Sequence, residues 1–203
     1  MHASPTDNWT PDESEVEDIV AELPTLVALR DFASGLARVA WFKRVGEPPD
    51  REEMRLALAY CDALGFPHAH IAAVGDWQAA LDCAENLDWD APAWEAEEQL
   101  RATLYGVLLE QVREEALTVA LTRVAAEAGH ALKDRMAEVA ALWDIADRPA
   151  LDVAAGAAAQ SAHQLALAHA AKADADHPFR HKFDLFGRGR WPIGIVGSSF
   201  NLF

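Results

Sequence analysis

The stretch EEALTVALTRVAAEAGHALKDRMAEVAALWD, residues 114–144, decides the fold together with PALDVAAGAAAQSAHQLALAHAA, residues 149–171. In the first stretch, apolar residues recur at steps of three and four, with one slip near Met136, and therefore share one stripe of a helix. Proline lacks an N–H and biases Arg148 away from helical geometry, so this helix ends before Pro149. Pro149 suits the first turn of a second helix, and we predict two long antiparallel helices. The stripe residues are Leu117, Leu121, Val124, Ala128, Ala131, Met136, Val139 and Leu142.

The centre of the second predicted helix, residues 153–159, carries almost no side-chain bulk. A glycine inside a helix costs about 1 kcal/mol relative to alanine, so we expect close packing of another helix over Gly156 and Ala158. The alternative is the alanine-rich composition of a high-GC genome. His163 shares the face of Gly156 in this prediction and is expected to be buried, where it needs a hydrogen-bond partner.

Helix-start signals recur in the first half of the chain. Residues 10–13 and 50–53 are capping signatures, and Asp76 is a further N-cap residue. Breaks are expected at Pro24, at residues 46–49 and at Gly65. The sequence therefore predicts an irregular segment at 66–75 and five more helices, over residues 10–23, 24–45, 50–64, 77–86 and 93–112.

Two clusters in this region carry alternative interpretations. Trp77, Trp89 and Trp94 fall within 18 residues. Tryptophan clusters bury a large area and also mark binding surfaces; we expect these three in the core. His68 and His70 could share a metal ion if they stood on a strand, but their neighbours predict a loop.

The last segment, residues 177–203, differs from the rest of the chain. It holds five of the eight phenylalanines, and its four basic residues against one acidic residue give a net charge of +3, so residues 1–176 carry −19. Residues 178–186 predict a short helix, and residues 191–203 predict two extended pieces around a turn. A two-stranded hairpin is marginal alone. We therefore expect the tail to pack on the acidic body, with docking on another protein or a second copy as the alternative.

Composition excludes several classes of protein. The formal net charge of −16 argues against nucleic-acid binding, because phosphates repel an acidic surface, and it favours basic partners. No apolar run approaches the ~18 residues that a membrane span needs. Residues 1–18 lack the features of a secretory signal, and Cys61 and Cys83 lack the spacing of a zinc site or a disulfide framework. We expect a soluble, cytoplasmic protein without membrane contacts.

One constellation could carry chemistry. Glu127 and His130 have the Glu-x-x-His spacing with which di-iron bundles aim two ligands inward, and Gln160 and His163 repeat the spacing on the partner helix. The turn at residues 147–148 would bring both pairs to one level. Against this interpretation, one glutamate is a glutamine, and Glu127 and His130 belong to a charged stripe that is typical of a solvated face. The other members of that stripe are Arg123, Asp134 and Glu138.

The sequence thus predicts an all-α protein, an antiparallel bundle of six to seven helices with a short extended or hairpin appendage at the C-terminus. Residues 1–9 are expected to be flexible, residues 10–176 to form the helical domain, and residues 177–203 to form the aromatic, basic tail. No phosphate-binding loop, GxSxG elbow or HExxH motif is present, so no motif determines a reaction.

Two classes of function follow. The first is a non-enzymatic adaptor or inhibitor whose acidic surface captures a basic protein; bacterial immunity proteins work in this way, and the comparison is one of charge and size only. The second is a metal-binding or enzymatic bundle that uses Glu127, His130, Gln160 and His163, with Glu127, His130 and His163 as metal ligands. We favour the first class, predict no cofactor, and note that the tail could also join two copies. The expected partner-binding residues are Glu95, Glu97, Glu98, Glu127, Asp134 and Glu138.

Overall fold

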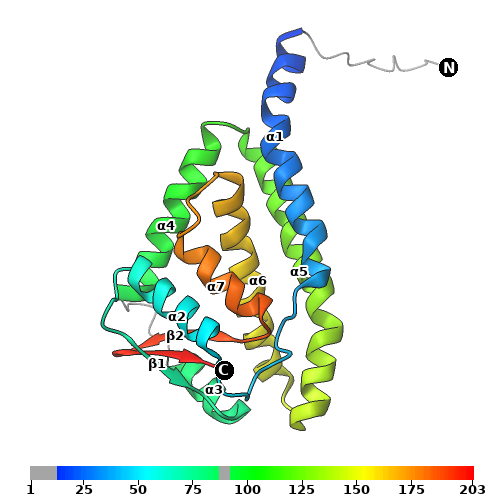
Figure 1. Ribbon diagram of the computed structural model, residues 1–203. Helices are drawn as coiled ribbons and strands as arrows, with labels where there is room; N and C mark the ends of the chain where they lie inside the picture. The colour runs from blue at the N-terminus through cyan, green and yellow to red at the C-terminus, as the bar shows by residue number, and fades with distance from the viewer. Residues whose placement is uncertain (1–12, 87–91) are drawn as a thin grey trace, which may run out of the picture.

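The computed structural model describes residues 13–86 and 92–203 (Figure 1). In these residues the chain forms seven α-helices and a three-stranded sheet, which confirms the predicted helical bundle with a C-terminal hairpin. The predicted flexible segment 1–9, the predicted cap at residue 10 and Trp89 lie outside the described residues. The helices are α1 (Glu13–Gly35), α2 (Arg51–Ala63), α3 (Trp77–Glu85), α4 (Pro92–Leu109), α5 (Glu114–Trp143), α6 (Arg148–Ala170) and α7 (Pro178–Gly187). A 3-10 helix η1 (Leu36–Arg38) follows α1, and the strands are β1 (His70–Ala73), β2 (Pro192–Val196) and β3 (Ser199–Leu202).

The antiparallel α5–α6 pair is the centre of the bundle, and α1 packs against both helices (Figure 1). The predicted stripe of α5 is buried over most of its length, but the prediction is wrong at two positions. Leu132 is buried in place of Ala131, and Leu142 is 75% exposed. The steps from Ala128 to Leu132 and on to Met136 each span four residues, so the expected slip does not occur, and the buried stripe ends at Val139.

Helix α1 continues through Pro24, so the predicted break there is wrong. Proline inside a helix costs about 3 kcal/mol. The turns after Pro24 bury Thr25, Leu29 and Ala33 at steps of four residues, and Leu29 is fully buried. Because tertiary packing of an amphipathic face supplies most of the stability of a helix in a protein, this packing holds the helix across the proline.

The chain then turns earlier than predicted, since α1 ends at Gly35 rather than near Val45. Trp41 and Phe42 have positive φ angles of 21° and 48°, and such strain costs about 1–3 kcal/mol. Both rings are buried against phenylalanines of α7, with centroids 5.5–5.7 Å apart. Burial of a large aromatic ring is worth about 3–5 kcal/mol by truncation, so the packing outweighs the strain.

Helix α6 presents alanines to its neighbours. Ala154, Ala158 and Ala162 are fully buried at steps of four residues, which places small side chains along one buried side of the helix. Gly156 lies on the exposed side, and a Cβ added there would meet nothing within 4 Å. The expected close packing therefore occurs over Ala158 and is wrong for Gly156.

This arrangement predicts opposite effects for two neighbouring substitutions. Ala158→Leu is expected to lower the free energy of unfolding by about 1–3 kcal/mol through overpacking. Gly156→Ala is expected to raise it by up to about 1 kcal/mol, because alanine has the higher helix propensity and has room. Chemical denaturation measures both, and equal destabilisation by the two variants would contradict this packing.

The sheet has the order β1-β3-β2, with β1 parallel and β2 antiparallel to β3. The prediction of an irregular segment at 66–75 is wrong, because β1 forms there. The N–H groups of His70 and Val74 donate to the carbonyls of Ser198 and Leu202, at 3.0 Å and 2.9 Å. Pairing with a segment more than a hundred residues away thus creates a strand that lacks a local signal.

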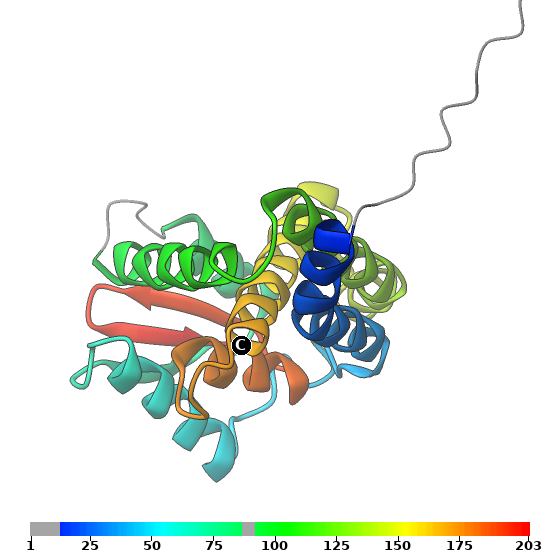
Figure 2. The same ribbon diagram turned by 90° about the horizontal axis from the view of Figure 1, so that it is seen from above.

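Helices cover the sheet. Figure 1 shows α2, α4 and α7 above the strands, and in the view from above in Figure 2 α4 runs along one long side of the β2–β3 hairpin and α2 with α7 along the other. Ile195 and Phe200, paired across the two strands, belong to a cluster that includes Leu56, Ala93 and Leu185, one residue from each of α2, α4 and α7. Helices from distant parts of the sequence therefore meet on one face of the sheet.

The C-terminal segment lies inside the protein. Its five phenylalanines, Phe179, Phe183, Phe186, Phe200 and Phe203, are each at most 8% exposed. The ring of Phe203, the last residue, lies 5.9 Å from that of Trp77 and 5.4 Å from that of Trp143. The predicted helix over 178–186 and the predicted turn between two extended pieces are both present.

Candidate functional site

One carboxylate, Glu97 of α4, is the meeting point of four helices. Its Oε1 accepts hydrogen bonds from the Tyr60 hydroxyl of α2 and from Nζ of Lys182 of α7, the latter at 2.6 Å. Its Oε2 accepts a bond of 2.9 Å from Nε2 of Gln164 of α6. Glu97 is 6% exposed and Gln164 is fully buried, so the carboxylate is held away from solvent.

The electrostatics of this buried centre depend on Lys182. Burial alone would raise the pKa of the Glu97 carboxyl, but the charge of Lys182 and the hydrogen bonds that the carboxylate accepts outweigh burial and lower the pKa. Burial, with the charge of Glu97, raises the pKa of Tyr60 well above its usual value. Glu97 is therefore ionised and Tyr60 protonated at neutral pH.

The buried centre is closed to substrates. Tyr60 is 2% exposed, and the side chain of Lys182 is 13% exposed. The neighbouring thiol of Cys61 is buried, and burial raises its pKa to about 12, so it stays protonated and unreactive. The arrangement suits a structural ion pair that aligns α2, α4, α6 and α7, and it exposes no group that could act on a bound molecule.

A second buried ion pair ties the C-terminal segment to the N-terminal half. Arg190 is 1% exposed, and its Nη2 donates to Oε2 of Glu53 at 2.9 Å. The same guanidinium donates to the carbonyls of Arg44, Glu47 and Pro48. Glu53 also closes the predicted capping box with Asp50, so a local helix-start signal doubles as the anchor for a distant arginine.

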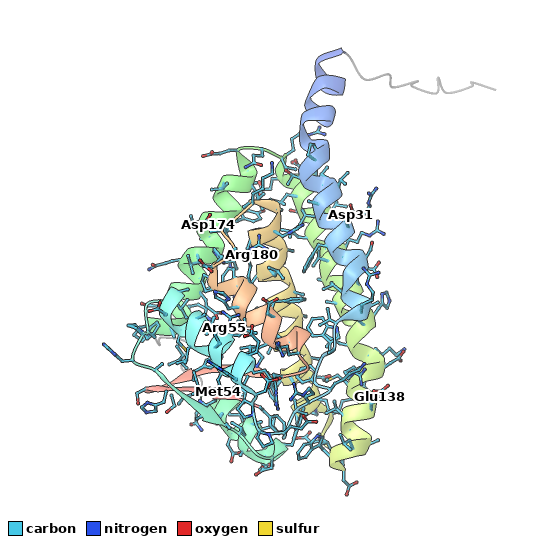
Figure 3. The ribbon with its side chains drawn as sticks, in the orientation of Figure 1. Asp31, Met54, Arg55, Glu138, Asp174 and Arg180 are labelled. Carbon is cyan, nitrogen blue, oxygen red and sulfur yellow. The ribbon has the colours of Figure 1, made fainter. Side chains whose placement is uncertain are left out.

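The structure separates the residues predicted to bind a partner. The prediction that Glu97 binds a partner is wrong, because this side chain is buried and hydrogen-bonded inside the protein. On α4, Glu95 is exposed and Glu98 pairs with Arg101 at 2.7 Å. On α5, Asp134 is exposed, Glu127 lies 4.0 Å from Arg123, and Glu138 pairs with Arg135. Figure 3 shows Glu138 at the outer side of α5, across the molecule from Arg55 of α2.

The residues predicted as metal ligands are placed as follows. His130 and Gln160 are exposed, and Glu127 is half-buried. His163 is half-buried rather than buried, and burial together with the charge of Arg101 lowers its pKa. In residues 13–86 and 92–203, no three His, Cys, Asp or Glu side chains are grouped so that they could hold a metal ion.

The distribution of basic residues along the chain did not enter the predictions from the sequence. Between Arg55 and Arg101 the sequence has nine Asp and Glu residues and no Lys or Arg. Asp62, Glu85 and Glu95 are exposed there, and they have no ion pair within the described part of the chain. We call residues 56–100, from α2 to the first half of α4, the acidic region.

The two described tryptophans of the acidic region differ in their exposure. Trp77 is 6% exposed and packs on Trp191, as predicted for a core residue. Trp94 is 37% exposed, so the prediction that it belongs to the core is wrong. It precedes the exposed Glu95 on α4, and tryptophan is one of the residue types that are enriched at protein interfaces.

An open pocket of about 360 Å³ lies where α6 and α7 meet and is lined by Leu165, Ala175, Arg180 and Asp184. Arg180 is fixed there, since its Nε and Nη2 donate to the carbonyls of Asp174 and Ala173, each at 3.0 Å. Burial raises the pKa of Asp184. One guanidinium and one carboxylate leave the pocket without a net charge that would select an anion or a cation.

The buried centre could have been recognised in part from the sequence. Glu97 follows Ala93 by four residues and precedes Leu100 by three, so it stands on the apolar stripe of α4 rather than on a solvated face. A charged residue in such a position needs a partner. Its partners Tyr60, Gln164 and Lys182 carry no spacing signal relative to Glu97.

Comparisons with known proteins give no relative from which a function could be transferred. No protein-family model matches the chain, and no curated protein or solved structure shows significant similarity to it. None of the described helices combines the length and the apolar character that crossing a membrane requires.

Proposed function

We propose that this protein is an acidic helical module that binds a basic protein partner through the acidic region. The observation that carries the proposal is the exposure of Asp62, Glu85 and Glu95 in a region of 45 residues without Lys or Arg. Uncompensated surface charge destabilises a compact protein through self-repulsion. A basic partner would relieve that repulsion, so binding of such a partner accounts for the exposed acidic charge.

The placement of the tail supports the same proposal. Its four basic side chains are all engaged within the chain. Lys182, Arg188 and Arg190 pair with Glu97, Asp50 and Glu53, and Arg180 donates to two backbone carbonyls. The tail therefore offers little positive charge to the surface. We also propose a cytoplasmic location, which suits two cysteines that are free thiols.

Charge reversal tests the proposal. The variant Asp62→Lys, Glu85→Lys, Glu95→Lys is expected to slow association with a partner captured from the protein's own host by at least about tenfold at low salt. Its melting temperature should stay close to that of the wild type, because exposed charges contribute little to stability. Surface plasmon resonance over a range of salt concentrations measures the association rate.

A variant with the same charge change on α5, Glu127→Lys, Asp134→Lys, Glu138→Lys, is the matched control and is expected to bind nearly as fast as the wild type. Loss of binding in the α5 variant alone would contradict the acidic region as the binding face. Association that does not depend on salt would contradict the basic partner.

The metal-binding alternative with Glu127, His130, Gln160 and His163 stays a prediction. No observation favours it over the binding module, and metal analysis of the purified protein decides it.

A further inference from the structure

The two edges of the sheet are built differently. On one edge, β2 begins with Pro192, has a register irregularity between Pro192 and Gly194, and packs against α3. Proline, bulges and covering helices are the devices with which proteins block an edge strand. On the other edge, β1 has the sequence His-Ile-Ala-Ala, which contains neither proline nor Asp, Glu, Lys or Arg, and it pairs with β3 without a register shift.

The hydrogen-bonding groups on the β1 edge can be assigned from the ladder. The N–H groups of His70 and Val74 point toward β3, and alternate residues of a strand point the same way. Ile71 and Ala73 therefore direct their N–H and C=O groups away from β3. Among the described helices, β1 packs chiefly against α2, which lies on a face of the sheet. His70 and Ala73 are exposed, and Ile71 is half-buried.

We propose that this open edge receives an extended, basic segment of the partner by β-strand addition. The proposal rests on the function proposed above and names the form of the partner. An open edge strand can form backbone hydrogen bonds with a peptide of any sequence. The charge of the peptide must therefore determine which peptide binds. The strand lies within the acidic region, between Asp62 and Asp76, and the region contains no Lys or Arg. A second copy of this chain, with a net charge of −16, would be repelled.

The experiment uses the full chain and a synthetic six-residue peptide of alternating lysine and valine. Backbone amide signals in heteronuclear NMR are expected to shift on titration, with the largest shifts at residues 70–74, and the shifts should weaken as salt rises. Two control peptides share its length. One is N-methylated at every backbone amide and therefore has no N–H on either side with which to pair with an edge, and one replaces lysine by glutamate; both are expected to bind at least about tenfold more weakly.

The variant Ala73→Pro removes an outward N–H and leaves the ladder to β3 intact. It is expected to weaken peptide binding about tenfold at a nearly unchanged melting temperature. Ala72→Pro, its matched control, removes an N–H that points toward β3 and is expected to lower the melting temperature. If Ala73→Pro does not fold, the comparison between the parent and the N-methylated peptide on the wild-type protein still decides the proposal.

Equal binding of the parent and N-methylated peptides would overturn strand addition. So would peptide-induced shifts confined to helices, or concentration-dependent shifts at residues 70–74 without peptide, which would assign the edge to a second copy. If the parent and N-methylated peptides bind equally, and this binding still weakens as salt rises and on charge reversal of Glu85 and Glu95, the protein is still an acidic binding module. The partner then does not bind by pairing with the edge strand. Salt-independent binding that N-methylation abolishes would support the edge and contradict the basic partner.

Discussion

Deletion of residues 191–203 is expected to abolish cooperative folding. The segment contributes six buried apolar side chains, Trp191, Ile193, Ile195, Phe200, Leu202 and Phe203. Burial of each such side chain is worth about 1.5–3 kcal/mol, so together they supply about 9–18 kcal/mol, which matches or exceeds the usual total stability of about 5–15 kcal/mol. The deletion also removes β2 and β3 and leaves β1 without a partner.

Thermal unfolding followed by near- and far-ultraviolet circular dichroism tests this expectation. The truncated chain should show no sigmoidal transition and should expose apolar surface to a fluorescent dye. Ser198→Ala, an exposed change in the turn of the same segment, is the control and should leave the melting temperature unchanged. A cooperative transition near the wild-type temperature in the truncated chain would show that the segment does not stabilise the body.

Glu97→Ala is expected to lower the free energy of unfolding by about 3–5 kcal/mol. The substitution leaves the charge of Lys182 in a site where its side chain is only 13% exposed, and an unpaired buried charge is strongly destabilising. Glu95→Ala, two residues away on the exposed side of α4, should change stability by no more than about 0.5 kcal/mol. The double variant Glu97→Leu, Lys182→Met should recover part of the loss, because it removes the unpaired charge, while Tyr60 and Gln164 still lose their acceptor.

The same carboxylate predicts a pH dependence. Because the pKa of Glu97 is lowered in the folded protein, its contribution is fully present above the unfolded-state pKa of about 4.3 and is lost as the pH falls through the lowered folded value. The difference in unfolding free energy between wild type and Glu97→Gln, measured by denaturation from pH 7 to pH 3, should therefore shrink below about pH 4. A difference that grows in acid, or a loss in Glu97→Ala no larger than in Glu95→Ala, would contradict the buried ion pair.

Local patterns were sufficient where a signal lies within one or two turns of a helix. Three helices begin where the sequence predicts them. They begin at the capping box of Asp50 and Glu53, at the N-cap Asp76 and after the turn that precedes Pro149. The three-residue and four-residue steps of α5 predict most of its buried face, and Phe179, Phe183 and Phe186 predict the buried side of α7. These signals are local because they depend on backbone geometry and on the helical repeat alone.

Other features depend on contacts between distant segments, and only the tertiary structure decided them. β1 exists because β3 pairs with it, and α1 continues through Pro24 because the turns that follow are packed. From the sequence, Glu97 was predicted to be one of three surface carboxylates on its helix, yet Lys182 and Gln164 enclose it. Residue spacing in a sequence does not indicate where four helices come together. By itself, the sequence determined most of the helices, the net charge of −16 and the basic, aromatic tail. The tertiary structure decided which charges are neutralised inside and which remain on the surface, because the free energy of a charge depends on its burial and on its partners.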